Sequence, residues 1–303
     1  MRPGPRLEVG MSLRTFDDIG AAARRYEELG YDYVTCGEHV SFHSPMPNSL
    51  ISLSVAAGAT STIRLLSAIT LAPLYPPVLL AKMVAALDVA SRGRLTLGVG
   101  VGGEYPPEFE ACSVPVAERG ARTNEALEIL TRLGSGEPVS YEGKFTRFPD
   151  ITIKPPPVQR PHPPIWVAGR SPAAMRRAAR FGAAWMPYMF TPDMVAESAA
   201  QVQALAGRPV RSALLIFFCV HRDGQTARAM AAEGLTRQYG QDFSRLVDRY
   251  ALAGTPDEVV GQARRFTDAG VSALMVASAC PAAYLNDNLA LFAAEVLPAL
   301  RDV

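Results

Sequence analysis

The feature that most constrains the fold is a regular alternation of short apolar segments with amphipathic ones. Eight segments have the composition of buried strands, and helical periodicity follows each of them. Helices that join successive strands predict a parallel sheet, and eight such units in one series are typical of a (β/α)8 TIM barrel. The predicted strands cover residues 7–11, 31–36, 63–70, 94–100, 165–169, 183–187, 212–220 and 272–278.

Two stretches are longer than a simple strand–helix unit requires. Residues 136–164 are rich in proline and lack periodicity, which predicts a surface excursion with one hairpin after the fourth strand. Residues 223–251 contain two helical segments after the seventh strand. Since strand signals flank both stretches, we interpret them as insertions and expect residues 1–303 to form a single domain. A doubly wound sheet is the alternative fold.

Charge and composition exclude several classes of protein. The net charge is +1 and no long basic run is present, so a small-molecule partner is expected rather than nucleic acid. Arg176, Arg177 and Arg180 have helical spacing and are interpreted as one solvated face. No segment has about 18 consecutive apolar residues, and the first ten lack an apolar signal core, so we expect no membrane association and a cytoplasmic location.

The stretch GVGVGG resembles the dinucleotide fingerprint G-x-G-x-x-G, with glycines at Gly98, Gly100 and Gly103. In that fingerprint the last glycine opens a helix. Here Pro106 and Pro107 follow almost at once, and we expect them to prevent a helix from starting there. The glycines are therefore interpreted as a strand end whose backbone passes close to a flat ligand.

Polar residues follow the second predicted strand, where a barrel places its active site. Glu38, His39 and His43 lie in this loop, although the chain has only four histidines. The order E-H-x-x-x-H differs from the H-E-x-x-H of zinc proteases and no third ligand is evident, so no metal site is predicted. His39 is predicted to exchange protons or contact a cofactor, and a hydrogen-bonded rim residue is the alternative.

Gly169, Arg170 and Ser171 follow the fifth predicted strand and begin a helix. Backbone N–H groups, a hydroxyl and a guanidinium at a helix N-terminus favour binding of an anion such as phosphate. The alternative is that Ser171 merely caps the helix, with a proline at the next position.

Further candidates come from the remaining strand ends. Aromatic and histidine side chains near these ends are predicted to line a pocket for a small organic substrate, with core or rim packing as the alternative. They are Phe42, His43, Tyr75, Tyr105, Trp185, Tyr188 and Phe190.

Two blocks of the sequence carry a family resemblance. Residues 79–130, LLAKMVAALDVASRGRLTLGVGVGGEYPPEFEACSVPVAERGARTNEALEIL, resemble the signature block of the bacterial luciferase-like oxidoreductases. Residues 155–187, PPPVQRPHPPIWVAGRSPAAMRRAARFGAAWMP, are similar to that family's strand-five segment. The resemblance extends over nearly the whole chain. It implies a barrel, in most members a homodimer, that binds FMN or the deazaflavin F420 at its mouth.

The resemblance also implies roles for individual residues. His39 and Glu38 before it match the acid–histidine pair near the reactive ring, and both are expected to be catalytic. Ser67, Ala68 and nearby Thr70 lie at the strand-three bulge, where many members have a cis non-prolyl peptide behind the ring. Three residues of the fourth strand end are expected beside the cofactor, and three of the fifth are expected to hold its phosphate. These six are Gly100, Gly102 and Glu104, and Gly169, Arg170 and Ser171.

The choice between the two cofactors depends on one position. FMN-dependent monooxygenases of this family carry an arginine just after strand four, where this chain has Val101, Gly102 and Gly103. That difference favours F420, although many F420-dependent members have Asp–His where this chain has Glu38–His39. With F420 we expect hydride transfer to or from a small substrate. With FMN we expect a two-component monooxygenase that uses O2, and in both cases a separate reductase.

Two other classes of function remain as alternatives. A non-catalytic flavin-binding protein would keep the fold and bind cofactor without turnover. A metal-dependent barrel hydrolase would contain stoichiometric metal.

Overall fold

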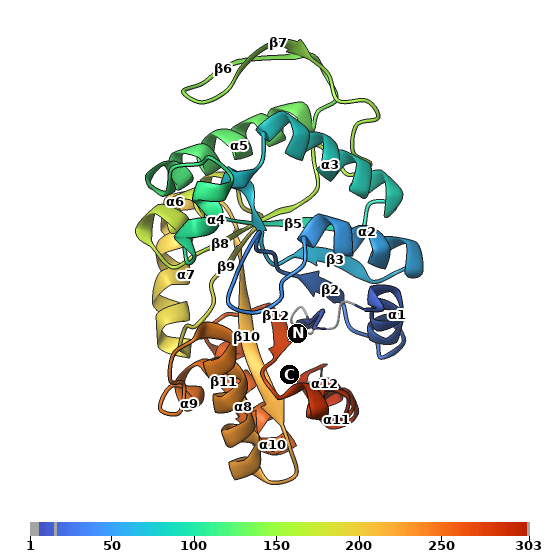
Figure 1. Ribbon diagram of the computed structural model, residues 1–303, viewed down its shortest axis with the longest axis vertical. Coiled ribbons are helices and arrows are strands. Elements are labelled where there is room, and N and C mark those ends of the chain that lie inside the picture. Colours follow the sequence, from blue (N-terminus) through green and yellow to red (C-terminus); the bar gives the residue numbers. More distant parts are fainter. Residues whose placement is uncertain (1–5, 15–16, 302–303) are drawn as a thin grey trace.

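The computed structural model describes residues 6–14 and 17–301 and contains a closed barrel of eight parallel strands (Figure 1). Strand β10 pairs with β12 on one side and with β9 on the other, which closes the ring. The predicted fold class is therefore confirmed, and the doubly wound alternative is wrong. The barrel strands are β1 (Glu8–Ser12), β2 (Tyr33–Cys36), β3 (Arg64–Ser67), β5 (Leu95–Gly100), β8 (Ile165–Ala168), β9 (Ala184–Met186), β10 (Arg211–Val220) and β12 (Ala273–Ser278).

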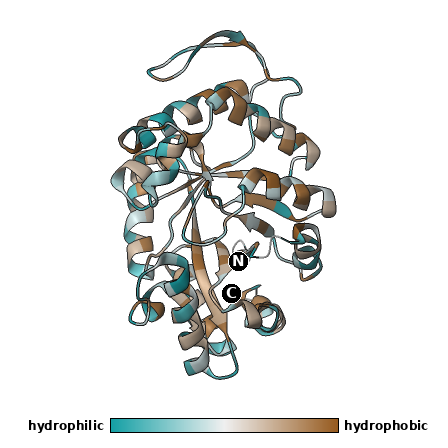
Figure 2. Ribbon diagram, in the orientation of Figure 1, coloured by the Kyte–Doolittle hydropathy of each residue, from teal (hydrophilic) through white to brown (hydrophobic). Residues whose placement is uncertain are grey.

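Helices surround the barrel and bury their apolar faces against its strands. Figure 2 shows mostly hydrophobic strands inside a ring of helices of mixed character. Local signals set several helix starts: Thr255 forms a capping box with Glu258 at the start of α10. The helices are α1 (Ile19–Glu28), α2 (Ser49–Ala59), α3 (Pro77–Ala90), α4 (Pro106–Ala111), α5 (Arg119–Leu133), α6 (Pro172–Phe181), α7 (Pro192–Ala206), α8 (Gly224–Tyr239), α9 (Val247–Tyr250), α10 (Pro256–Asp268), α11 (Leu285–Leu291) and α12 (Leu297–Arg301).

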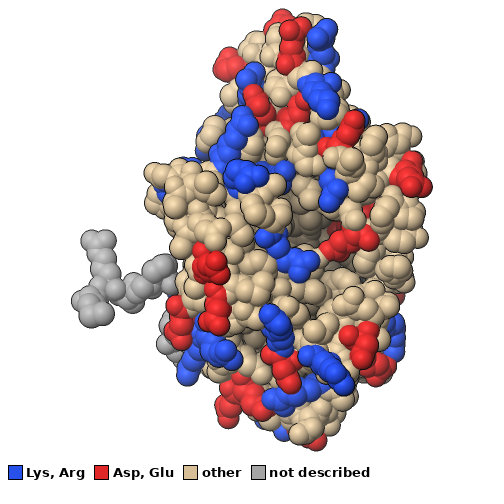
Figure 3. Space-filling model, turned by 90° about the vertical axis from the view of Figure 1, so that its left-hand side faces the viewer, with Lys and Arg blue, Asp and Glu red and all other residues tan. Residues whose placement is uncertain are grey.

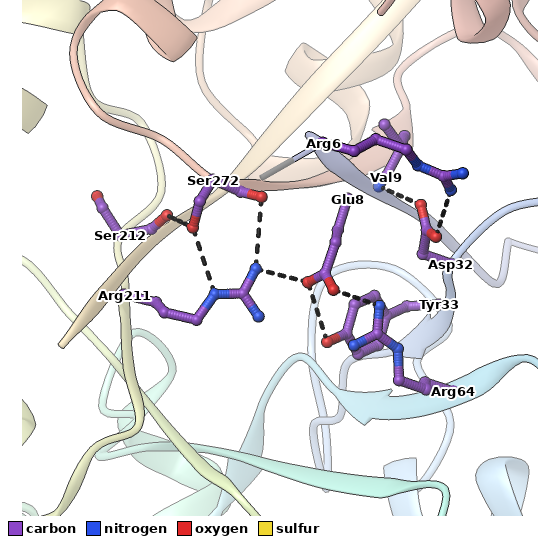
Figure 4. A network of polar contacts seen from close by, with 9 residues as sticks. All are labelled: Arg6, Glu8, Val9, Asp32, Tyr33, Arg64, Arg211, Ser212 and Ser272. Atoms are coloured by element: carbon purple, nitrogen blue, oxygen red, sulfur yellow. Dashed lines mark hydrogen bonds and ion pairs between the residues drawn. The ribbon is translucent and has the colours of Figure 1, made fainter. Parts of the chain in front are cut away.

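Side chains fill the inside of the barrel, and a polar network lies at the amino ends of the strands. Tyr33 and Met275 pack so tightly around Gly10 that a Cβ there would lie 2.5 Å from the Met275 sulfur. Below them the Glu8 carboxylate accepts hydrogen bonds from Arg64 and Arg211, each at 2.6 Å (Figure 4). These contacts tie β1 to β3 and β10 and close the base of the barrel.

Both predicted insertions are present. After the fourth barrel strand the chain forms an antiparallel hairpin, β6 (Val139–Glu142) and β7 (Arg147–Ile151), which projects from the barrel in Figure 1. Gln159 anchors the rest of this excursion by donating hydrogen bonds to the buried Asp88 carboxylate. The insertion after the seventh strand contains α8, α9 and β11 (Ala251–Gly254), a strand beside β10 that the sequence reading does not predict.

Two local predictions are wrong. Helix α4 begins at Pro106, because a proline in the first helical turn needs no N–H partner. Arg177 is buried rather than solvated, since its guanidinium donates to the Asn124 side chain and to the Gly120 carbonyl. The predicted strand 63–70 is divided into β3 and the two-residue β4 (Thr70–Leu71), with a cis peptide bond between Ala68 and Ile69.

Candidate functional site

A cavity of about 690 Å³ opens at the carboxyl ends of the barrel strands. Residues that follow strands from all around the ring contribute to its wall, as expected for the active face of a TIM barrel. The lining is mainly apolar, with a few charged side chains between aromatic and aliphatic ones. Such a mixture suits an organic ligand that polar groups hold in one orientation.

One wall of the cavity depends on the glycines of β5. A Cβ on Gly98 would lie 1.9 Å from the Ser67 carbonyl oxygen, and one on Gly100 would lie 1.7 Å from the Ile69 side chain. Gly98 and Gly100 thus make room for the chain between β3 and β4, and Gly100 also lines the cavity, where its backbone stays open to a ligand as expected from the sequence. Ala68 and Ile69, on either side of the cis peptide, line the cavity.

His39 lines the cavity and is held by a buried carboxylate. Its Nδ1 lies 3.1 Å from Glu108 Oε1, and the Val40 backbone N–H donates to the other oxygen of Glu108 at 3.0 Å. Glu108 is fully buried, while the His39 ring stacks on Phe42 with 4.1 Å between centroids. Because a carboxylate accepts, Nδ1 donates in this pair, and Nε2 has no hydrogen-bond partner among the described residues.

Glu38, the other residue predicted to be catalytic, is buried at the cavity wall with both oxygens engaged. One oxygen accepts from the Leu71 backbone N–H at 2.7 Å. The other accepts from the Ser49 hydroxyl at 2.7 Å and from the Tyr75 hydroxyl at 3.1 Å. These bonds join the end of β2 to β4 and to the start of α2.

Glu104 and Arg170 lie on neighbouring strand ends at the cavity mouth. The Glu104 side chain reaches solvent, yet protein crowds it on the cavity side, and this desolvation raises its pKa although His39 and Arg170 oppose the effect. The Arg170 guanidinium lies 5.0 Å from the centroid of the Tyr188 ring. Arg170 is exposed and therefore available to an anionic ligand.

The predicted phosphate segment is only partly at the cavity. Gly169 and Arg170 line it, whereas Ser171 caps α6 through its hydroxyl, which accepts from the Ala174 backbone N–H. Gly169 has φ +121° and a Cβ there would lie 2.8 Å from Ala174, so only glycine fits this turn. The capping alternative for Ser171 is thus what the structure contains.

Other predicted site residues are divided between cavity and framework. Gly100, Gly102, Ala68, Phe42 and Tyr188 line the cavity. The Ser67 hydroxyl instead bonds Gly98 on β5, and the Thr70 hydroxyl bonds Ser49. The following predicted pocket residues are not part of the cavity wall: His43, Tyr75, Tyr105, Trp185 and Phe190.

The sequence reading misses several residues of the cavity. It also misses Glu108, which is buried behind His39 and is not part of the cavity wall, because the short helix α4 that turns it toward His39 starts at a proline. Ile69 follows the cis peptide, and Arg14 follows β1. Phe217 near the end of β10 and Tyr239 at the end of α8 have their rings 6.0 Å apart. The only signal for these residues in the sequence is their position after or within predicted strands and helices.

Three further observations describe the chain around the site. Within residues 6–14 and 17–301, no group of three or more His, Cys, Asp or Glu side chains could hold a metal ion. Over the same residues, no helix combines the length and the apolar character needed to cross a membrane. On the face seen in Figure 3, acidic and basic side chains intermingle around a hollow, without a patch of one sign.

Comparisons with known proteins agree with this geometry. The family model for luciferase-like monooxygenases matches residues 2–273. The chain is 32% identical over 170 residues to the oxygenase component of a flavin-dependent trigonelline monooxygenase from Acinetobacter baylyi, covering 55% of this chain and 47% of that relative. It is 28% identical over 319 residues to an F420-dependent glucose-6-phosphate dehydrogenase from Microbacterium testaceum, covering 94% and 92%.

Solved structures that resemble this chain include the monooxygenase RslO1 from Streptomyces bottropensis. The match has a TM-score of 0.85 and 29% sequence identity, and it covers 96% of this chain and 99% of that one. The chain spans about half the length of several curated relatives that it matches. A family model that covers most of the chain, together with a barrel of matching architecture, confirms the predicted family. The chain belongs to the luciferase-like monooxygenases, a family of oxidoreductases.

Proposed function

We propose that this protein is an oxidoreductase that uses F420 for hydride transfer to or from a small organic substrate. The observation that carries the proposal is the His39–Glu108 pair, which points a free imidazole nitrogen into a mainly apolar cavity. Hydride transfer between carbon atoms and a cofactor needs such a group when an alcohol or a carbonyl takes part, because a proton moves as well.

The residues of the cavity fit a deazaflavin or flavin. Ala68 and Ile69 offer a flat wall behind a planar ring, and Arg170 with Gly169 stands where an anionic side chain of the cofactor would reach the start of α6. When bound, F420 would accept or donate a hydride. The sequence after β5, Val101 to Glu104, supplies no arginine for an FMN phosphate, and this supports F420 over FMN.

The protein's own groups then have distinct parts. His39 Nε2 accepts the hydroxyl proton when an alcohol is oxidised and returns it when a carbonyl is reduced. Glu108 positions the ring and stabilises its charged form. Glu38, with its oxygens saturated by donors, positions the strand ends and takes no part in proton transfer. Apolar side chains exclude water from the reacting atoms.

The second candidate is an FMN-dependent two-component monooxygenase that uses reduced flavin and O2. The observation that favours it is the 29% identity to the monooxygenase RslO1 over almost the full length of both chains. With FMN, or with F420 when the substrate is reduced, a separate reductase would supply the reduced cofactor. When the substrate is oxidised, a separate enzyme would reoxidise the reduced F420.

A titration of the purified protein with F420 and with FMN, followed by fluorescence, separates the candidates. We expect saturable binding of F420 at micromolar concentration and weak binding of FMN. Tight FMN binding without F420 binding would overturn the first proposal in favour of the second. The protein could also bind a cofactor whose redox state does not change with any alcohol, any carbonyl or O2. That result would favour a non-catalytic flavin-binding protein.

We also propose that the protein is a homodimer formed through α2. This helix has no charged residue in its eleven positions and exposes Ile51 and Val55, while neighbouring α3 exposes Leu79. A second copy suits this face, because a two-fold contact places uncharged helix against uncharged helix. Light scattering should find a dimer for the wild type and for L205E on α7, and a monomer for I51E. A monomeric wild type would refute this interface.

A further inference from the structure

Arg14 lies at the cavity on the strand end next to the one that carries His39. The Leu13 backbone N–H donates to the Thr35 carbonyl at 2.9 Å, so the chain stays beside β2 beyond the end of β1. Arg14 follows directly and lines the cavity. Its position therefore brings a guanidinium to the same part of the mouth as the proposed proton-exchanging residue.

The side chains packed around Arg14 are neutral, while the acidic Asp17, which also lines the cavity, is exposed to solvent and forms no ion pair among the described residues. The titratable groups that face it are the hydroxyls of Tyr26 and Tyr239 and the thiol of Cys280. Burial raises the pKa of Tyr26 to about 12, and it also raises the pKa values of Tyr239 and Cys280, so all three are uncharged near pH 7. Burial lowers the pKa of Arg14, but a guanidinium keeps its proton at neutral pH.

Arg14 differs from the other arginines at the cavity in its lack of a partner. Arg237 pairs with Glu233 at 2.6 Å, and Arg170 is exposed and close enough to Glu104 to influence its pKa. Among the described residues, by contrast, Arg14 has neither a hydrogen bond nor an ion pair. The Arg14 side chain is only partly exposed, and a partly desolvated positive charge without a protein partner gains stability from an anion on a bound molecule.

The arrangement of the ring separates Arg14 from the expected cofactor phosphate. In the order of the eight barrel strands, β1 and β8 are four positions apart, so Arg14 and Arg170 stand on opposite sides of the mouth. Aromatic side chains from other elements lie around the cavity: the Tyr239 ring is 6.3 Å from Phe42 and 6.0 Å from Phe217. An apolar body can therefore lie against these rings while its charged end reaches Arg14.

We propose that Arg14 binds a carboxylate, or an anion of similar size, on a substrate whose apolar body packs against Phe42, Phe217 and Tyr239. The inference rests on the proposed function, since it assigns the substrate class of the same cavity. It places the anionic group one strand end away from His39, so a reacting alcohol or carbonyl and the anion belong to the same side of the substrate. Arg170 remains for the cofactor.

The test uses 2-naphthoate and its neutral analogue 2-naphthamide as probes, with affinities measured by calorimetry on the folded full-length chain. We expect the wild type to bind naphthoate about tenfold more tightly than naphthamide, as for one charge-assisted contact. R14Q should abolish this preference and leave the affinity for naphthamide unchanged. The matched variant R170Q should keep the preference and weaken binding of F420 or FMN instead.

Other results would overturn the proposal. A wild type without preference for naphthoate, or an R14Q variant that retains it, refutes an anion site at Arg14. An R14Q variant that loses cofactor affinity while the naphthoate preference persists assigns the anion to the cofactor. If R14Q does not fold, R14M, which also removes the charge, and competition by inorganic phosphate on the wild type replace it: R14M should lose the preference, and phosphate should weaken naphthoate binding alone. Absence of F420 and FMN binding would refute the proposed oxidoreductase without affecting the naphthoate result.

Discussion

The side chain of Ile69 occupies the space that a Cβ on Gly100 would need, because its Cδ1 atom lies 1.7 Å from that position. Two strand ends that are 31 residues apart in sequence are therefore fitted to each other at the cavity wall. The contact explains why a strand that is buried along its whole length, β5, contains glycine at its last position. It also suggests the first test of the structure.

Replacing Gly100 with alanine should destabilise the protein. The new methyl group would displace Ile69 and the wall formed by Ala68, at a cost of about 1–3 kcal/mol in the free energy of unfolding. I69V removes the colliding carbon atom, so the double variant should recover part of the loss. Urea denaturation measures both effects.

Gly261 in α10 provides the matched control. It is exposed, and a Cβ there would meet nothing within 4 Å. G261A should raise the free energy of unfolding by about 0.5–1 kcal/mol, as alanine does in helices. Equal effects of G100A and G261A would contradict the fit between Ile69 and Gly100.

Loss of the His39 imidazole should remove most of the activity while the cofactor still binds. H39A should lower turnover by roughly 10²–10⁴-fold if this residue moves the proton. The rate of F420 reduction with the best alcohol from a screened panel is the measurement, and fluorescence titration follows cofactor affinity. An active H39A variant would reduce His39 to a packing role.

Glu108 should matter through His39. E108Q should lower turnover on the order of 10²-fold and change the pH–rate profile, because an amide no longer stabilises the charged imidazole. E110Q is the control, since Glu110 is exposed on the same helix. Equal rates for E108Q and E110Q would show that the buried carboxylate does not assist His39.

Arg170 should contribute to cofactor binding. R170A is expected to weaken F420 or FMN binding by about tenfold, the effect of one charge-assisted contact. R176A, on the exposed face of the same helix, should leave the affinity unchanged. If both variants bind cofactor like the wild type, the cofactor anion lies elsewhere.

The Glu8 network predicts how stability changes with pH. Burial would raise the pKa of Glu8, but hydrogen bonds from Arg64 and Arg211 outweigh this effect and the net pKa is lowered. Its contribution is therefore present at neutral pH and is lost as the pH falls below about 4, through the lowered pKa of the folded state. E8Q should lower the free energy of unfolding by about 1–2 kcal/mol at pH 7, and the difference should shrink in acid.

Glu142 serves as the comparison for Glu8. It pairs with Arg147 at 3.5 Å, but both side chains are about three-quarters exposed. E142Q should have no measurable effect at any pH, as for most exposed ion pairs. A constant difference between E8Q and the wild type across the acid range would contradict the ionic origin of the Glu8 effect.

The sequence predicts the barrel because periodicity and helix caps act locally. It also places His39 and Arg170 correctly, since any residue just after a barrel strand reaches the same end. Glu108 escapes prediction because it is 69 residues from His39 in the sequence, and only the fold brings the two side chains into contact. The cis bond between Ala68 and Ile69 is expected at this bulge only from the family resemblance, because no local pattern of residue types signals it.

Several of the residues predicted to line the pocket do not face the cavity. Trp185 stands at a strand end, yet side chains alternate along β9: Ala184 and Met186 face the barrel interior, and Trp185 packs between the barrel and the helices. The Tyr75 hydroxyl donates a hydrogen bond to Glu38, and its side chain does not line the cavity. Which face a side chain takes depends on the register of the strand, which composition alone does not reveal.

The packed interior and the Glu8 network at the base give the cavity the form of a dead end. If cofactor and substrate bind as proposed, both enter through the mouth at the carboxyl ends of the strands, and the molecule in the deeper place arrives first and departs last. Ordered binding follows, with excess substrate able to obstruct the exchange of cofactor. The closed base of the barrel thus has a kinetic consequence: excess substrate should inhibit turnover, and a larger substrate should inhibit it more strongly.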